Sequence, residues 1–265
     1  MFSPWQLGLR YLKYFATAQN GKGHGIHSPF VYDLVTEVLN NTQTYYCYGP
    51  IEAQRMALLQ NHALLQVEDF GAGSRTGAKK ERSVASIART ALKPRKYGQL
   101  LFRMVNHYRP QVIVELGTCL GITTAYLASA HTGAHVYTLE GATQVAQVAG
   151  LQWKELNLQN IQCITGPFEQ TLQPLLDTLH QVDFAYLDGN HRLAPTLAYF
   201  EALLPKCHAA SILVMDDIHW SAEMEQAWQQ VKQHPAVTLT VDLFYLGLVF
   251  FNDDIKVKQD FVIRF

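Results

Sequence analysis

After Pro110, short apolar runs alternate with longer segments in which apolar residues recur at helical spacing. Seven runs have the length and composition of strands: Val112–Leu116, His135–Leu139, Ile161–Thr165, Asp183–Leu187, Ser211–Met215, Val237–Asp242 and Gly247–Phe251. Helical patterns separate the first five runs, among them Gln144–Leu158, Glu169–Leu179 and Leu193–Leu204. Alternation of this kind predicts a parallel sheet with helices on both faces.

The last two runs differ from the others because only Leu243–Leu246 separates them. Four residues are too few for a helical crossover, so these two strands should pair antiparallel. The sequence therefore predicts an α/β fold over residues 110–265. We expect a doubly wound sheet of five parallel strands that ends in an antiparallel C-terminal hairpin.

Residues 1–109 have a different pattern, in which nearly every periodic segment is helical. The predicted helices are Trp5–Ala18, Ser28–Asn40, Ile51–Ala63, Ser83–Leu92 and Gln99–Tyr108. Ser28-Pro29 is a good helix start, since a capping residue precedes a first-turn proline. We predict a helical N-terminal extension that covers a substrate or contacts a second subunit.

Composition narrows the class of protein. Of the 265 residues, 48% are hydrophobic and 16% charged, and a net charge of −1 gives no reason to expect a nucleic-acid partner. The four cysteines form no CxxC pair, and Cys119 and Cys163 fall in predicted core segments, which favours a reduced, cytoplasmic protein. The longest apolar run, Leu243–Phe251, is too short to span a bilayer, so we expect no stable membrane insertion.

The first predicted strand leads into a glycine loop. It ends in Glu115, and Gly117 and Gly121 then lead to an apolar segment that starts at Ile122. Glycine permits a sharp turn or a close approach of a ligand, and the free N–H groups of the next helix can bind a ligand carboxylate. Glu115 would suit a ligand with an amino group, whereas the pyrophosphate of NAD would gain nothing from it. This pattern resembles motif I of the class I S-adenosylmethionine-dependent methyltransferases, whose Rossmann-like fold has the predicted strand layout.

The resemblance implies further contacts to S-adenosylmethionine at the next strand ends. Glu140 closes the second strand and can accept hydrogen bonds from both ribose hydroxyls, although a strand-end glutamate can also be merely solvated. Phe168 follows the third strand and would contact adenine, or belong to the core. The implied cofactor residues are Glu115, Gly117, Thr118, Gly121, Glu140, Gly141, Gly166, Phe168 and Asp188.

A second glycine segment, Val67–Ser74, is a weaker match. Little apolar sequence precedes it, and the residues after it are charged rather than helical and apolar. It would line the substrate side or form a simple turn.

Acidic residues follow the fourth and fifth predicted strands. Asp188, Asp216 and Asp217 would be costly at these apolar strand ends without compensation, and a hard divalent cation would provide it. The spacing resembles the metal-dependent O-methyltransferases of the catechol, caffeoyl-CoA and macrocin types, and Trp220 matches a tryptophan of the caffeoyl-CoA type. The resemblance implies Mg²⁺ bound by the three aspartates. The alternative is a metal-free enzyme that keeps an acid after the fourth strand for another purpose.

The expected catalytic residues are His191, Asp188 and His219. His191 stands where the catechol-type enzymes carry a lysine, and a histidine can serve as general base near neutral pH. His219 is the competing base, and either histidine could instead be a hydrogen-bonded loop residue.

These observations predict a cytoplasmic methyltransferase that uses S-adenosylmethionine, with Mg²⁺-assisted O-methylation of a small-molecule hydroxyl. The expected binding partner is the small acceptor molecule, and one expected role of the N-terminal helices is contact in a homodimer. A metal-independent N- or O-methyltransferase and a non-catalytic ligand-binding protein are the alternatives. An NAD-dependent dehydrogenase is disfavoured because the loop is not GxGxxG.

Overall fold

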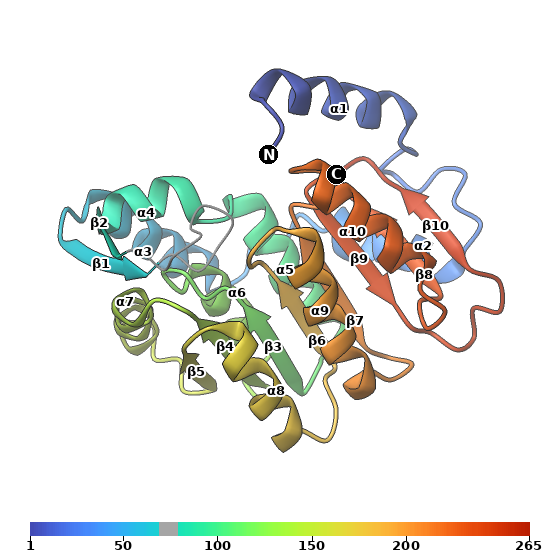
Figure 1. The fold of residues 1–265 in the computed structure, drawn as a ribbon. Coiled ribbons are helices and arrows are strands. Elements are labelled where there is room, and N and C mark those ends of the chain that lie inside the picture. The colour runs from blue at the N-terminus through green and yellow to red at the C-terminus, as the bar shows by residue number, and fades with distance from the viewer. Residues whose placement is uncertain (69–78) are drawn as a thin grey trace. The chain divides into compact units, whose positions relative to one another are not determined.

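The structure is a computed structural model that describes residues 1–68 and 79–265 (Figure 1). The chain packs into two compact units, and each is described by itself. One unit comprises residues 42–175, and the other comprises residues 1–41 and 176–265. The domain boundary predicted at residue 110 stays a prediction. Most of the glycine segment Val67–Ser74 lies outside the described residues.

The unit of residues 42–175 contains three parallel strands. β3 (Val112–Leu116), β4 (His135–Glu140) and β5 (Ile161–Thr165) pair in that order. Helices α6 (Ile122–Ala130) and α7 (Thr143–Glu155) connect them, and α8 (Phe168–Thr178) begins after β5. Four of the five β3 residues are buried, as expected for a strand covered on both faces. These elements agree with the sequence prediction.

The same unit also holds helices α3 (Tyr48–Gln60), α4 (Val84–Ala91) and α5 (Arg95–Tyr108). The sequence predicted only helices here, but β1 (Leu64–Glu68) and β2 (Lys79–Ser83) pair antiparallel. β2 reads Lys-Lys-Glu-Arg-Ser, a composition without a strand signal. Its conformation comes from pairing with β1, which in turn packs against α7.

In the other unit, β6 (Phe184–Leu187) and β7 (Ile212–Asp216) are parallel. β9 (Leu246–Phe250) pairs antiparallel with both β7 and β8 (Leu239–Asp242), as predicted for the C-terminal strands. A further strand, β10 (Gln259–Val262), runs parallel to β8 and was not predicted. Helices α9 (Leu193–Leu203) and α10 (Ala222–Gln233) pack against each other, with the 3₁₀ turn η2 (Leu204–Lys206) after α9 (Figure 1).

The N-terminal helices of this unit are α1 (Pro4–Thr17), α2 (Pro29–Asp33) and the π-helix η1 (Leu34–Leu39). Ser3 and Gln6 form a capping box that starts α1. At the other end of α1, the hydroxyl of Tyr14 donates a hydrogen bond to the carbonyl of Ile263. The single helix predicted over Ser28–Asn40 is wrong in detail, because the backbone changes from α to π at Leu34.

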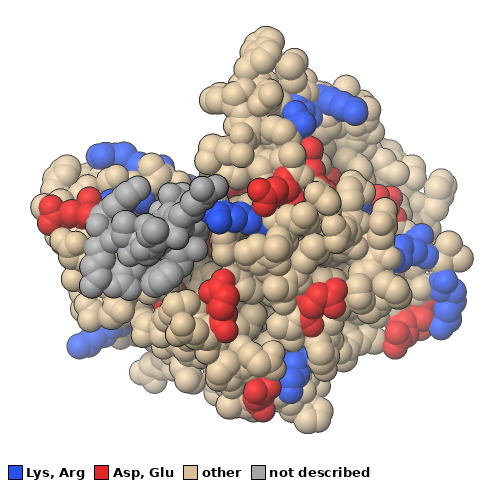
Figure 2. Space-filling view, in the orientation of Figure 1, with Lys and Arg blue, Asp and Glu red and all other residues tan. Residues whose placement is uncertain are grey.

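All four cysteines are free thiols, as predicted. Cys119 and Cys163 are partly exposed rather than core residues, and Cys47 is the buried one. No helix in the described ranges combines the length and apolar character needed to cross a membrane. On the face shown in Figure 2, acidic and basic side chains are interspersed among uncharged residues.

Candidate functional site

The glycine loop after β3 is fixed by backbone conformation. Gly117, Cys119 and Gly121 have φ angles of 100°, 49° and 80°, in the left-handed region where glycine has no steric cost. The amides of Gly117 and Thr118 both donate to the carbonyl of Leu139, at 3.0 and 3.2 Å. The loop is thereby tied to the end of β4.

Gly121 is required for a second reason, the close approach of α7. A Cβ at this position would lie 2.7 Å from Nε1 of Trp153 and 2.8 Å from Cβ of Ala149. Nε1 of Trp153 donates a hydrogen bond of 2.9 Å to the Gly121 carbonyl. This glycine therefore serves the packing of α7 on the start of α6, a role that the sequence analysis did not identify.

Glu115 lies at the end of β3 and is 0% exposed. Its Oε2 atom accepts hydrogen bonds from the hydroxyls of Thr124, at 2.5 Å, and Thr138, at 2.6 Å. The Thr138 hydroxyl also lies 2.5 Å from that of Thr118 in the loop. The carboxylate thus bonds one residue of α6 and one of β4, and it reaches Thr118 of the loop through Thr138. Its predicted contact with a ligand amino group stays a prediction.

Glu140 joins two loops through its carboxylate. Oε2 accepts a hydrogen bond of 2.8 Å from the amide of Cys119, and Oε1 accepts one of 2.9 Å from the amide of Ala142. The side chain is half-buried. Glu140 therefore shapes the glycine loop, and its predicted contact with the ribose hydroxyls stays a prediction.

The end of β5 supplies the remaining predicted cofactor residues. Gly166 has a φ of 136°, and its amide donates to the Glu140 carbonyl at 2.9 Å. Phe168 begins α8 and is half-buried, as is Gly141 after β4. The predicted cofactor residues of this unit all lie at or just beyond the carboxyl ends of β3, β4 and β5, the edge where open parallel sheets bind ligands.

Three threonines complete this arrangement, and two of them were missed. Thr124 is a fully buried hydroxyl of helix α6, and Thr138 is a buried hydroxyl within β4. The sequence shows that these residues are polar but not that they are buried beside a carboxylate. Each needs an acceptor when buried, and Glu115 supplies it.

In the other unit, Asp188, His191 and Asp216 come together at the ends of β6 and β7. One ligand atom from each lies within 4.8 Å of the other two. Nε2 of His191 is 3.3 Å from Oδ1 of Asp188, whose Oδ2 accepts a hydrogen bond of 3.2 Å from the Tyr186 hydroxyl. Asp216 is 1% exposed. The two carboxylates and the imidazole are a donor set that fits a divalent cation.

Asp217 is not part of that group. Its backbone has a φ of 51°, and the residue lines a small hollow with Leu7, His219, Trp220, Phe244 and Tyr245. Its role as a metal ligand stays a prediction.

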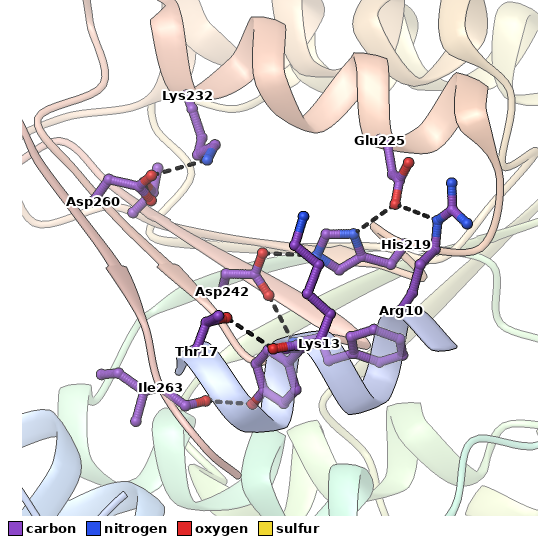
Figure 3. A network of polar contacts seen from close by, with 12 residues as sticks. Arg10, Lys13, Thr17, His219, Glu225, Lys232, Asp242, Asp260 and Ile263 are labelled. Carbon is purple, nitrogen blue, oxygen red and sulfur yellow. Dashed lines mark hydrogen bonds and ion pairs between the residues drawn. The ribbon is translucent and has the colours of Figure 1, made fainter. Parts of the chain in front are cut away.

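His219 is held between two carboxylates (Figure 3). Its Nε2 lies 2.8 Å from Oδ2 of Asp242, and its Nδ1 lies 3.2 Å from Oε1 of Glu225, which also accepts a 2.9 Å bond from Arg10. Burial alone would lower the pKa of His219, but the hydrogen bond and charge of Asp242, with those of Glu225, raise it above its ordinary value. With both ring nitrogens engaged, this geometry favours a structural role over that of a general base.

Comparison with known proteins finds one family model that resembles part of the chain. Residues 114–218 match the family model described as a methyltransferase domain. No curated protein sequence matches the chain.

Several solved structures share the fold. The O-methyltransferase TomG of Streptomyces achromogenes, in complex with S-adenosylmethionine, has 19% identity and a TM-score of 0.52, over 61% of this chain and 82% of its own. An O-methyltransferase of Bacillus cereus, bound to S-adenosylhomocysteine, has 17% identity and a TM-score of 0.57. The match covers 80% of this chain and 93% of the Bacillus protein. The methyltransferase PaMTH1 of Podospora anserina, also bound to S-adenosylhomocysteine, has 12% identity and a TM-score of 0.59. The match covers 96% of this chain and 98% of PaMTH1. The likeness confirms the Rossmann-like fold class.

Proposed function

We propose that this chain is a class I S-adenosylmethionine-dependent methyltransferase that methylates a hydroxyl group of a small molecule with the help of a divalent cation. The observation that carries the proposal is the glycine loop of the matched domain, with Glu140 bonded to it at the carboxyl end of β4. A second cluster, at the ends of β6 and β7, supplies the ligands for the cation.

The loop residues would bind and orient the methyl donor. The amides of Cys119 and Ala142 hold the Glu140 carboxylate in place from two sides, at the strand end where it would accept the ribose hydroxyls. Thr118 and the turns at Gly117 and Gly121 would bind the methionine part of the donor, because the positive φ angles of the two glycines leave the backbone of the loop open to a ligand. The donor itself supplies the reactive methyl group on its sulfonium, so the chain contributes position and electrostatics.

Asp188 and Asp216 would hold the cation, for which the sequence predicts Mg²⁺. When bound, such an ion lowers the pKa of an acceptor hydroxyl and fixes its oxygen. Tyr186 orients Asp188 through its hydroxyl, and the burial of Asp216 gives that carboxylate a fixed position. Carboxylates pre-arranged in this way stabilise the ion without reorganising at the moment of reaction.

The proposal is tested by transfer of a labelled methyl group from S-adenosylmethionine to a panel of hydroxyl and amine acceptors. We expect label on a hydroxyl compound, loss of transfer with EDTA and recovery with Mg²⁺. Asp216→Asn should abolish the recovery, whereas the surface change Asp254→Asn should not affect it. Full activity in EDTA would contradict the metal-assisted reaction, and label only on amines would contradict O-methylation.

A further inference from the structure

The acidic cluster differs from the ligand set that the sequence predicts. Among the described residues, the only group with metal-ligand spacing is Asp188, His191 and Asp216. Ligand atoms about 2.1 Å from an octahedral ion lie about 3 Å apart when adjacent and about 4 Å apart when opposite. Mutual separations within 4.8 Å therefore need only a small contraction to enclose an ion.

Strand geometry accounts for the presence of Asp216 in this group and the absence of Asp217 from it. Asp216 is the last residue of β7, where successive side chains point to opposite faces. Asp217 then leaves the strand in a left-handed conformation and lines the hollow beside His219 and Trp220. Two adjacent acids in the sequence are thus directed to different places.

His191 takes the place that the sequence analysis assigned to Asp217. The turn after β6 passes through Asn190 and His191, with φ angles of 66° and 34°, and brings the imidazole back to Asp188. Its Nε2 atom faces Oδ1 of Asp188 at 3.3 Å, while the Tyr186 hydroxyl bonds the other oxygen. The ring nitrogen and the carboxylate oxygen thus lie side by side.

We propose that His191 is the third protein ligand of the metal site, and that its nitrogen makes the site prefer a divalent first-row transition ion over Mg²⁺. Mg²⁺ prefers oxygen ligands, whereas imidazole suits the transition ions, whose affinity rises from Mn²⁺ towards Cu²⁺. The inference rests on the proposed function in that it names the ion of the same site. It also replaces the predicted role of His191 as general base, because a lone pair donated to a metal cannot accept a proton.

Binding of Co²⁺ and Mg²⁺ to the full chain, measured by calorimetry without donor or acceptor, tests the proposal. Co²⁺ serves as the probe because its visible absorption responds to a nitrogen ligand. We expect Co²⁺ to bind at least about tenfold more tightly than Mg²⁺. His191→Ala should weaken Co²⁺ binding by about tenfold or more and change the absorption band, with a much smaller effect on Mg²⁺.

Two further variants keep the test decisive. His191→Asp restores a third ligand, but as oxygen, so it should bring the affinities for Mg²⁺ and Co²⁺ closer together. Asp217→Asn should leave both affinities unchanged. Equal affinity of the wild type for the two ions would overturn the proposal, as would a loss of Co²⁺ binding in Asp217→Asn but not in His191→Ala. Because no methyl transfer is measured, these results are independent of the labelled-methyl assay, which alone decides the proposed function.

Discussion

Nε2 of His219 lies 2.8 Å from Oδ2 of Asp242, and the ring stacks on Phe244 with centroids 5.1 Å apart. On its other side the ring contacts Glu225, which Arg10 of α1 also binds. One imidazole therefore links the start of α10 to β8, and through Glu225 it is connected to the N-terminal helix (Figure 3).

This relationship predicts a pH dependence of stability. The folded pKa of His219 is raised, so its stabilising effect is complete below its unfolded pKa of about 6.5 and is lost as pH rises through the higher folded value. At pH 6 we expect His219→Gln to lower the free energy of unfolding by about 2 kcal/mol. Urea titrations of both proteins should show a smaller difference at pH 9. A difference that does not change with pH would contradict a charged imidazole in the fold.

Gly121→Ala should damage the glycine loop. The added Cβ meets Trp153 and Ala149 at less than 3.0 Å, and the φ of 80° is strained for alanine. We expect a loss of about 2 kcal/mol in unfolding free energy and weaker binding of S-adenosylmethionine. Thermal melting and calorimetry measure the two effects.

Gly150→Ala is the matched control for Gly121→Ala. Gly150 lies within α7, and a Cβ there would meet nothing within 4 Å. This change should stabilise the chain by about 0.5–1 kcal/mol, because alanine is the better helix former. If both alanine variants behaved alike, the packing role assigned to Gly121 would be wrong.

Glu140→Gln should separate donor binding from folding. The amide side chain offers one acceptor oxygen, where the carboxylate accepts from both Cys119 and Ala142 and carries a charge. We expect about tenfold weaker S-adenosylmethionine binding with a small change in melting temperature. Glu155→Gln, at the end of α7, should bind the donor normally. Unchanged affinity in Glu140→Gln would rule out its role at the ribose.

The outer face of α1 gives the expected homodimer a structural basis. Trp5, Leu9 and Leu12 are 76%, 50% and 64% exposed, an apolar stripe that a second copy of the chain would cover. We predict a dimer in sedimentation experiments that Leu9→Glu combined with Leu12→Glu converts to a monomer. Val257→Glu, at an apolar position 77% exposed outside α1, should remain dimeric. A monomeric wild type at tens of micromolar would contradict the prediction.

Much of the fold could be predicted because strands begin with uninterrupted apolar runs such as Val112–Val114, and Glu115 and Glu140 mark the ends of two of these runs. β2 could not be predicted, because its sequence is polar and its extended conformation comes from pairing with β1.

The sequence could predict which strand ends carry the residues of the site. It could not predict the directions of consecutive side chains, so Asp217 appeared equivalent to Asp216 although only Asp216 belongs to the cluster with Asp188. The partners of His219 were equally invisible: Asp242 lies 23 residues away on another element, and Glu225 lies six residues away across a turn, so neither contact follows a periodic pattern.

The most direct test of the account is calorimetric titration of the full chain with S-adenosylmethionine and, separately, with NAD. We predict saturable binding of one S-adenosylmethionine per chain, weakened in Glu140→Gln, and no binding of NAD. Absence of heat with S-adenosylmethionine, or saturable binding of NAD, would contradict the assignment of the glycine loop.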